Sequence, residues 1–255
     1  MHAPEHWQCI DLVSDLHLCD ALPRTFAAWA AHLRASRADA ILILGDLFEF
    51  WPGDDALELP FERQCFEVLA EAARARYVGV MVGNRDFLLG PALLQQHGLH
   101  ALADPTLLVA FGQRVLLSHG DALCLSDVAY QQFRRWVRDP ATQRDFLARP
   151  LAERVALGAK VRHASEAGRH QAAPAEGYGD IDAGAAVAWL RTAGATRLVH
   201  GHTHRPGDSV LEPGFDRCVL SDWDLDDAPE HAGVLRLSAA GLARLAPEEG
   251  AAGAA

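Results

Sequence analysis

The sequence predicts an α/β protein interrupted by a helical segment, and three observations support this. Strand and helix signals alternate over the first half of the 255-residue chain. Strand character is lost between about residues 127 and 191, and it returns from Thr196 onward. Half of the residues are hydrophobic, so a domain of this length can bury a sizeable core.

The first half contains three short apolar runs bounded by turn residues, which predict buried strands. The runs are residues 10–14, 41–44 and 78–82. Between them, residues 25–37 and 61–76 predict helices, the first preceded by Pro23. In the second helix the apolar positions recur at helical spacing, at Phe66, Leu69 and Ala73.

A hairpin and a second set of strands are expected further along the chain. Residues 107–111 and 114–118 flank Gly112, which is typical of a β-hairpin. The later strands are expected at Thr196 and near Ser209, Arg217, Gly233 and Ala243. We therefore expect a single domain over residues 1–246, followed by a small, acidic and flexible tail over 247–255.

The middle of the chain, residues 127–191, predicts several helices inserted into this domain. The helix breaks are expected at Pro140, Pro150 and Pro174. Residues 130–170 carry nine Arg or Lys against four Asp or Glu, whereas the whole chain has a net charge of -11. A basic helical insertion in an acidic protein indicates a lid over an anionic ligand. A solvated helical face would carry the same charge pattern.

Composition excludes several classes of protein. The net charge of -11 argues against general electrostatic binding to nucleic acid. The five cysteines are scattered without a C-x-x-C pair, which favours a reduced, cytosolic chain. The N-terminus lacks the basic and apolar regions of a signal peptide, and no apolar run approaches the roughly 20 residues that span a bilayer. Any membrane contact is therefore expected to be peripheral.

Five apolar runs end in residues that can bind metals, and this is the most informative pattern in the chain. Because open α/β sheets carry their sites at the carboxyl ends of strands, these residues predict one shared site. The residues are Asp15, His17, Asp46, Asn84, His119, His202 and His204. Taken alone, each of the five strand ends could equally be an ordinary turn or an ordinary histidine. The occurrence of all five in one chain, each after an apolar run, makes a chance pattern improbable.

The spacing and type of these residues predict the chemistry of the site. Asp15 and His17 are two residues apart at a strand end, so both are expected to reach one ion, and the same argument applies to His202 and His204. Asp46 follows a glycine, where its carboxylate can bridge two ions. Seven ligands without a thiolate suit two divalent ions, most simply Mn²⁺. Such a pair favours in-line hydrolysis at phosphorus.

The motifs D-L-H, G-D, G-N, H and G-H-T-H, in this order, resemble the signature of the calcineurin-like metallophosphoesterases. The resemblance implies a four-layer α/β/β/α sandwich with a two-metal centre at one edge. It implies that one metal is held by Asp15, His17, Asp46 and His204, and the other by Asp46, Asn84, His119 and His202. His200 is not expected to be a ligand.

Longer motifs resemble one family within this superfamily, the UDP-2,3-diacylglucosamine pyrophosphohydrolases of lipid A synthesis. The motifs include S-D-L-H-L, L-G-D-L-F-E, G-N-R-D-F-L-L-G, H-G-D-A-L-C and H-G-H-T-H-R-P, and the resemblance runs from about residue 9 to about 245. It implies attack of water on the α-phosphorus, with Asp46, Asn84 and Arg85 as catalytic residues. Arginine offers phosphate oxygens a charged, bidentate fork.

The family resemblance also implies substrate contacts and a location. The substrate-binding residues would be Asn84, Arg85, Asp127, Ser165, Arg169 and His202, with the helical lid binding the acyl chains. A lysine found in the family's lid pattern is missing here, and Arg169 or His170 would replace it. The enzyme would be cytoplasmic and peripheral to the inner membrane, without an obligatory protein partner. The alternatives are a metallophosphoesterase for soluble nucleotides or phosphodiesters, and a non-catalytic protein-binding scaffold.

Overall fold

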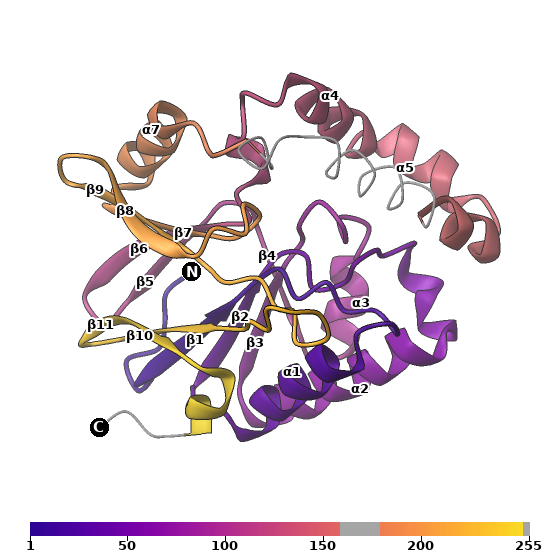
Figure 1. Cartoon of the computed structure of the whole chain (residues 1–255), viewed down its shortest axis with the longest axis horizontal. Coiled ribbons are helices and arrows are strands. Elements are labelled where there is room, and N and C mark those ends of the chain that lie inside the picture. The colour runs from indigo at the N-terminus through magenta and orange to yellow at the C-terminus, as the bar shows by residue number, and fades with distance from the viewer. Residues whose placement is uncertain (159–178, 252–255) are drawn as a thin grey trace.

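Two β-sheets lie face to face in the computed structural model, which describes residues 1–158 and 179–251 (Figure 1). The first sheet has the strand order β11-β10-β1-β2-β3-β4, and the second has the order β5-β6-β7-β9-β8. The first consists of β1 (Cys9–Val13), β2 (Ala40–Leu44), β3 (Tyr77–Met81), β4 (His100–Leu102), β10 (Val234–Ser238) and β11 (Gly241–Leu245). The second consists of β5 (Thr106–Ala110), β6 (Gln113–Ser118), β7 (Arg197–His200), β8 (Gly207–Glu212) and β9 (Phe215–Val219).

Helices cover the outer faces of both sheets. The outer face of the first sheet carries α1 (Pro23–Ala35), α2 (Pro60–Ala75) and α3 (Pro91–Gln96). Each of these three helices begins with a proline, which suits the first turn because no partner for its missing N–H is needed there. The second sheet carries α7 (Ala183–Ala193). Asp182 caps the start of this helix, and Gly194, in the left-handed conformation, ends it.

The hydrophobic core is divided between the layers. One cluster joins the first sheet to its helices, a second lies between the two sheets, and a third joins the second sheet to α7. In the middle cluster, Leu42 of β2 and Leu117 of β6 are fully buried. The predicted four-layer α/β/β/α sandwich is therefore confirmed.

The predicted hairpin and later strands are also present. β5 and β6 pair antiparallel, and Phe111 and Gly112 between them have φ angles of 53° and 73°. Two successive positive φ angles are those of a type I′ turn, which explains why glycine occurs there.

A separate group of helices extends beyond the sheets. It comprises α4 (Val128–Val137), α5 (Pro140–Leu147) and the helical residues 151–158, which we call the helical arm. The arm curves past the edge of the sandwich where the strands end (Figure 1). The breaks at Pro140 and Pro150 are confirmed, whereas Pro174 lies outside the described residues.

Two boundaries differ from the sequence-based expectation. The predicted lid, residues 127–191, includes α7, but Ala186 and Leu190 of α7 pack on the second sheet. This helix is therefore a layer of the sandwich, since helical periodicity does not reveal which surface a helix packs on. In the tail, residues Pro247–Ala251 form a short 3-10 helix, η3, and the Gly250 carbonyl accepts hydrogen bonds from Arg37 and Arg236.

The topology brings many strand ends to one edge. β1, β2 and β3 run parallel in the first sheet, and β6 and β7 run parallel in the second. Their carboxyl ends meet beside the helical arm (Figure 1). No helix among residues 1–158 and 179–251 has the length and apolar character needed to cross a membrane.

Candidate metal centre

The loops after these strands have an unusual backbone. Asp15, His17, Asp46, His202 and His204 all have positive φ angles, between 46° and 66°. Residues other than glycine seldom adopt this conformation, and when they do it often marks a functional site. The conformation turns these side chains back over the strand ends.

Neighbouring loops stabilise this strained backbone. The N–H groups of Leu16 and His17 donate to the Asp46 carbonyl at 2.9 and 3.0 Å. The N–H of His202 donates to the Asp15 carboxylate at 2.9 Å. Gly45 has a φ angle of 92°, and a Cβ there would lie 2.4 Å from Nδ1 of His119. Only glycine therefore fits between β2 and the His119 ring.

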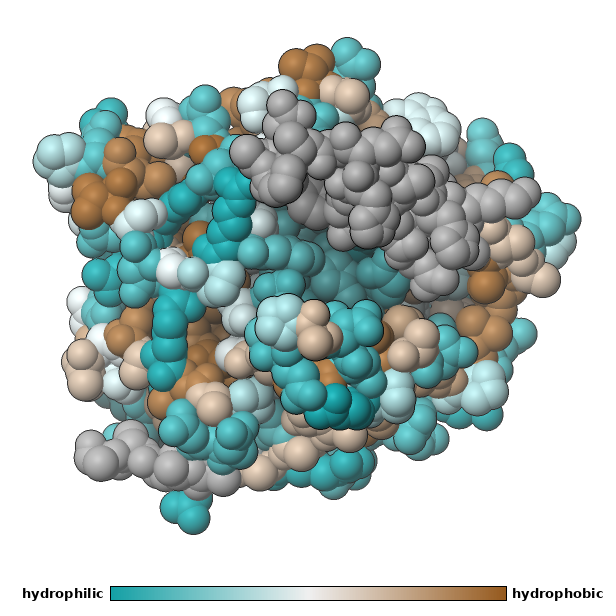
Figure 2. Space-filling model, viewed as in Figure 1, coloured by the Kyte–Doolittle hydropathy of each residue, from teal (hydrophilic) through white to brown (hydrophobic). Residues whose placement is uncertain are grey.

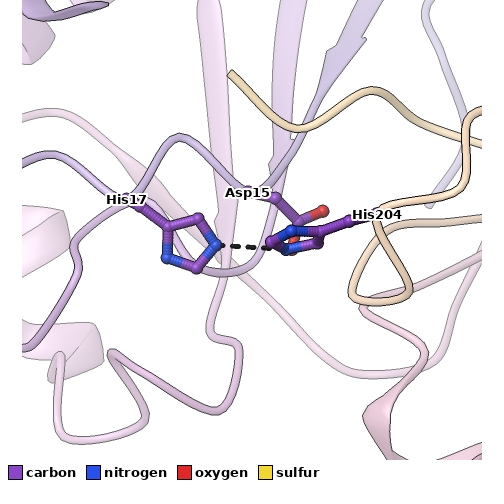
Figure 3. A group of neighbouring side chains, drawn as sticks. All are labelled: Asp15, His17 and His204. Atoms are coloured by element: carbon purple, nitrogen blue, oxygen red, sulfur yellow. Dashed lines mark hydrogen bonds and ion pairs between the residues drawn. The ribbon is translucent and has the colours of Figure 1, made fainter. Parts of the chain in front are cut away.

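The first group of ligand-type side chains is Asp15, His17 and His204 (Figure 3). The Nε2 atoms of the two histidines are 3.3 Å apart, and His204 Nε2 lies 3.5 Å from Asp15 Oδ1. Ligand atoms bound about 2.1 Å from one ion lie roughly 3–3.5 Å apart, so these separations suit a shared cation.

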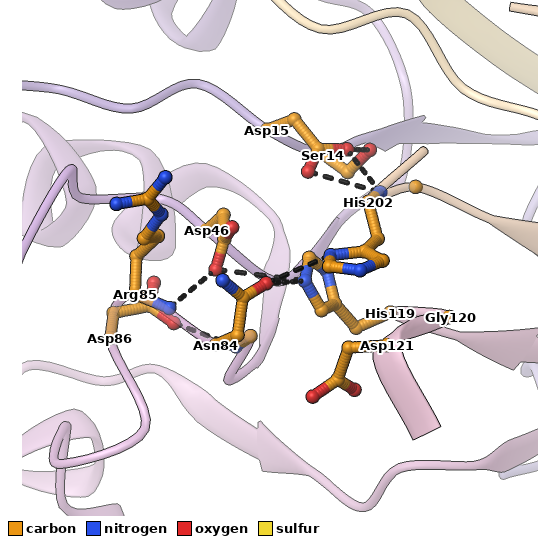
Figure 4. A network of polar contacts seen from close by, with 12 residues as sticks. Ser14, Asp15, Asp46, Asn84, Arg85, Asp86, His119, Gly120, Asp121 and His202 are labelled. Atoms are coloured by element: carbon orange, nitrogen blue, oxygen red, sulfur yellow. Dashed lines mark hydrogen bonds and ion pairs between the residues drawn. The ribbon is translucent and has the colours of Figure 1, made fainter. Parts of the chain in front are cut away.

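The second group is Asp46, His119 and His202, with the side-chain oxygen of Asn84 reaching both rings (Figure 4). Asn84 Oδ1 lies 2.9 Å from His119 Nε2 and 2.9 Å from His202 Nδ1. His119 Nε2 lies 3.6 Å from Asp46 Oδ1. All three of Asp46, His119 and His202 are buried, so this group is more enclosed than the first.

Asp46 faces both groups. Its Oδ2 atom is 4.0 Å from His17 Nε2, while its Oδ1 atom is 3.6 Å from His119 Nε2. A carboxylate with one oxygen toward each group is arranged as a bridging ligand would be. This agrees with the position that the sequence predicts for Asp46.

His202 and His204 do not act as the i, i+2 argument predicts. They belong to different groups, because the chain between them is not extended. The N–H of Thr203 donates to the Gly201 carbonyl at 2.7 Å, and both histidines have left-handed backbones. The division between groups instead follows the family resemblance. His200 lies outside both groups and is fully buried, with its Nδ1 2.9 Å from the Gly201 carbonyl oxygen.

Three of the histidines have an oxygen close to their outward nitrogen. Nδ1 of His119 is 3.0 Å from the Leu44 carbonyl, Nδ1 of His17 is 2.9 Å from Glu49, and Nδ1 of His204 is 3.2 Å from Asp222. Such oxygens fix ring orientation and tautomer in metal sites and leave Nε2 free to coordinate. Sequence reasoning missed Glu49 and Asp222, because neither directly follows a strand.

The electrostatics of the site favour a cation. Burial opposes protonation of His119 and His204, but the carboxylates of Asp46 and Asp15 beside His119, and of Asp15 and Asp222 beside His204, outweigh it. They raise the pKa of His119 to about 9 and that of His204 to about 10.

Other groups respond to the same field. Burial, assisted by His119, lowers the pKa of His202 to about 3. Burial opposes ionisation of Asp15, yet the neighbouring imidazoles hold its pKa below the usual range. A neutral imidazole and ionised carboxylates are the forms that bind metals.

Arg85 and Asp86 organise the loop beside Asp46 (Figure 4). The N–H of Arg85 donates to Asp46 Oδ1 at 2.8 Å, and its guanidinium lies 3.4 Å from Glu49. Asp86 is fully buried and accepts the N–H groups of Gly83 and Leu47 at 2.7 and 2.8 Å. Burial, and then Asp46, raise the pKa of Asp86 to about 6.

The predicted substrate contacts are only partly within the described residues. Ser165 and Arg169 lie outside them. Asp127 caps α4, where its carboxylate accepts the N–H of Tyr130 at 2.9 Å. Asn84, Arg85 and His202 lie together at the centre (Figure 4).

Asp121 is a further residue that sequence reasoning missed. It is fully buried, and its Oδ2 atom accepts from the Tyr130 hydroxyl at 2.6 Å and from Arg134 Nε at 2.7 Å. Arg138 donates to the Gly83 carbonyl at 2.9 Å. These contacts tie α4 of the helical arm to the loops of the metal centre. The sequence offered one signal, the H-G-D run that places Asp121 two residues after His119.

The residues present therefore form two groups of the kind that hold divalent cations. The two groups contain all seven predicted ligands once Asn84 is added, and Asp46 lies between them. The donor set is oxygen and imidazole, which suits Mn²⁺ and similar ions.

Comparison with known proteins adds independent findings. A model of calcineurin-like phosphoesterases matches residues 10–206, a range that includes all seven ligands. The chain is 46% identical over 235 residues to the UDP-2,3-diacylglucosamine hydrolase of Ralstonia nicotianae, covering 88% of this chain and 87% of the relative. It is 43% identical over 221 residues to that of Chromobacterium violaceum, covering 84% and 90%. A solved archaeal phosphodiesterase superposes with a TM-score of 0.48 at 10% identity, over 93% of this chain and 98% of that one.

Proposed function

We propose that this chain, which belongs to the calcineurin-like phosphoesterases and within them to the UDP-2,3-diacylglucosamine hydrolases, cleaves the pyrophosphate bond of UDP-2,3-diacylglucosamine. The products would be UMP and 2,3-diacylglucosamine 1-phosphate, a step of lipid A synthesis. The observation that carries the proposal is the pair of ligand groups joined by Asp46, with Arg85 anchored beside them.

Two Mn²⁺ ions would occupy the centre, one at Asp15, His17, Asp46 and His204, the other at Asp46, Asn84, His119 and His202. Bound there, the ions would lower the pKa of a water and neutralise the charge of the pyrophosphate. The structure supports this arrangement through the separations between ligand atoms and the negative field of the carboxylates.

The chain's own groups would then orient the reaction. Water adds its oxygen to the α-phosphorus, the bond to the bridging oxygen breaks, and the sugar 1-phosphate leaves. Arg85 would stabilise the charge that develops at phosphorus. Its backbone N–H is fixed on Asp46, and its guanidinium lies 3.4 Å from Glu49, which also lies beside His17. Asn84 and His202 would hold a phosphate oxygen from the opposite side of Asp46 (Figure 4).

The helical arm would bind the acyl chains and keep the enzyme at the membrane surface. Most of the large exposed hydrophobic side chains in the described residues lie on or next to the arm: Leu125, Val128, Phe133, Trp136, Leu147 and Val155. Figure 2 shows hydrophobic groups at the rim near α4 and hydrophilic ones gathered in the middle of the same face. Acyl chains at the rim and a pyrophosphate in the middle would match this distribution. We place the enzyme in the cytoplasm, peripheral to the inner membrane.

Product analysis tests the function directly. Purified protein with Mn²⁺ is incubated with UDP-2,3-diacylglucosamine, ADP-ribose or diadenosine tetraphosphate. UMP and the acylated sugar 1-phosphate should form fastest from the first substrate. Faster cleavage of either soluble nucleotide would reject the proposal in favour of another phosphoesterase, and cleavage of none would favour a protein-binding scaffold.

A substrate without acyl chains tests the role of the arm. Each buried methylene contributes roughly 0.8 kcal/mol, so UDP-glucosamine should have a kcat/KM lower by several orders of magnitude. Comparable kcat/KM values for the two substrates would show that the arm binds no lipid.

A further inference from the structure

Glu49 occupies a position between two loops of the metal centre. Its N–H donates to the Leu18 carbonyl at 3.2 Å, just after the loop that carries His17. Two residues later, the Trp51 N–H donates to the Arg85 carbonyl at 3.2 Å. The Glu49 side chain is only 15% exposed. The backbone therefore fixes Glu49 beside both a predicted metal ligand and the predicted catalytic arginine.

The two carboxylate oxygens of Glu49 contact different partners. Oε2 lies 2.9 Å from Nδ1 of His17, an ion-pair distance without hydrogen-bond alignment, and Oε1 lies 3.4 Å from Nη1 of Arg85. A negative charge this close to Nδ1 favours the tautomer that carries its proton there, which leaves Nε2 as the coordinating atom. His17 Nε2 indeed points to His204, 3.3 Å away (Figure 3). One side chain thus contacts both His17 and the guanidinium.

Asp222 provides an internal comparison. It lies 3.2 Å from Nδ1 of His204, as Glu49 lies beside Nδ1 of His17. Its other side-chain contact among the described residues is with His231, at 3.0 Å. Asp222 therefore supports a ligand of the same group but has an imidazole where Glu49 has an arginine.

We propose that Glu49 is a positioning residue that couples the first metal group to Arg85. By holding His17 and the guanidinium at once, it would fix the arginine relative to the ion that His17 binds. Asp222 would orient His204 and pairs with His231 rather than with an arginine. The inference rests on the proposed function for the role of Arg85, but its metal-binding part does not depend on the substrate.

The first test measures Mn²⁺ binding to the metal-free protein by electron paramagnetic resonance. Glu49→Gln and Asp222→Asn keep side-chain size and remove the charge. Each should weaken the affinity of one of the two ions by about 10- to 100-fold, the range typical of lost outer-shell partners. Glu71→Gln is the matched control, since Glu71 pairs with Arg34 at the surface. Unchanged Mn²⁺ affinity in Glu49→Gln would overturn the proposal, whichever substrate the enzyme prefers.

The second test is a double-mutant cycle with Arg85→Ala, measured as kcat at saturating Mn²⁺. Glu49→Gln should lower kcat on the order of 10-fold in the parent enzyme and much less when Arg85 is already absent. Asp222→Asn should lower kcat by the same factor in both backgrounds. Additive effects of Glu49→Gln and Arg85→Ala would overturn the coupling, as would equal coupling of Asp222 and Glu49 to Arg85. If the cycle showed no activity with UDP-2,3-diacylglucosamine while Mn²⁺ binding changed as expected, the proposed function would be at fault and the coupling would be tested with the substrate found.

Discussion

The strand-end centre and the helical arm are built by different means. At the centre, Asp15 and His119 are fully buried, and their loops are joined to two sheets by backbone hydrogen bonds. In the arm, no residue of α4 is buried, and Trp136 is 61% exposed. The arm is joined to the sandwich mainly by polar anchors, Asp121 at one end and Arg154 at the other.

This difference matches two different tasks, chemistry at the strand-end centre and lipid binding on the helical arm. Reacting groups need positions fixed to within a fraction of an ångström, and sheets provide such rigidity. A surface that admits a flexible lipid can be held less firmly, and less stable elements open more readily. Arg154 illustrates the second kind of anchor, because its guanidinium contacts Asp55 and the Pro52 carbonyl of the sandwich through hydrogen bonds rather than through a core. Four predictions test the comparison, beginning with the largest expected effect.

Asp46→Ala should remove nearly all activity, because each ligand group loses a carboxylate oxygen. We expect kcat/KM to fall by more than about 10³-fold, since losing a single oxyanion donor already costs roughly 10²–10³. Stability should change little, because the lost acceptor for the Arg85 N–H is offset by relief of repulsion with buried Asp86. Turnover, thermal unfolding and metal content check this.

Asp46→Asn is the matched control, since it keeps an oxygen for the Arg85 N–H. Near-normal turnover with two bound metals in Asp46→Ala would show that Asp46 is not the bridge.

Arg85→Ala should act on the transition state. We expect kcat to fall by about 10²–10³ while KM changes much less. Arg85→Lys should recover only part, because one ammonium cannot replace a bidentate fork. Steady-state kinetics separate the two parameters, and an unchanged kcat with a raised KM would mean that Arg85 only binds substrate.

The gathering of the seven ligand-type residues at one sheet edge could be predicted, because strand ends leave a strong signal. Short apolar runs that stop at Asp, Asn or His identify both the strand and the ligand. What the sequence could not predict was the backbone between ligands. The i, i+2 rule holds for extended chain, whereas His202 and His204 are left-handed and point to different groups. Glu49 and Asp222 were missed because their role depends on contacts between loops distant in sequence.

The arm was predictable only in composition. Its charge and proline breaks were clear from the sequence, but the boundary with α7 was not. A helix with an apolar stripe looks the same whether it covers a sheet, as Ala186 and Leu190 do, or extends beyond it. The H-G-D run placed Asp121 near His119, but its role as an anchor could not be predicted, because it depends on Tyr130 and Arg134 reaching back across a turn.

Asp121→Asn should loosen the arm and leave the sheets intact. The substitution removes the charge that Arg134 and Arg138 contact, and hydrogen bonds to a charged group contribute roughly 1.5–3 kcal/mol. Because both arginines are partly exposed, we expect the free energy of local opening of α4 to fall by about 1–2 kcal/mol. Amide hydrogen exchange in α4 should accelerate roughly 5- to 30-fold, while exchange in β1 and β2 stays unchanged. Equal acceleration in the sheets would show that the arm and the sandwich open as one unit.

Arg135→Ala should weaken membrane association slightly and leave the chemistry unchanged. Arg134 of α4 and Arg138 just after it contact Asp121, whereas Arg135 is exposed and next to Trp136 in the sequence. A basic residue near an anionic leaflet contributes about 1 kcal/mol, so affinity for phosphatidylglycerol vesicles should fall about 5-fold. Arg34→Ala, which removes an exposed charge from α1 on the opposite side of the first sheet, should not change vesicle binding. Sedimentation with vesicles measures the affinity, and kcat with a dispersed short-chain substrate serves as the control. Equal losses of vesicle affinity in Arg135→Ala and Arg34→Ala would mean that the helical arm does not bind the membrane preferentially. The proposed role of the arm would then be limited to binding the lipid substrate.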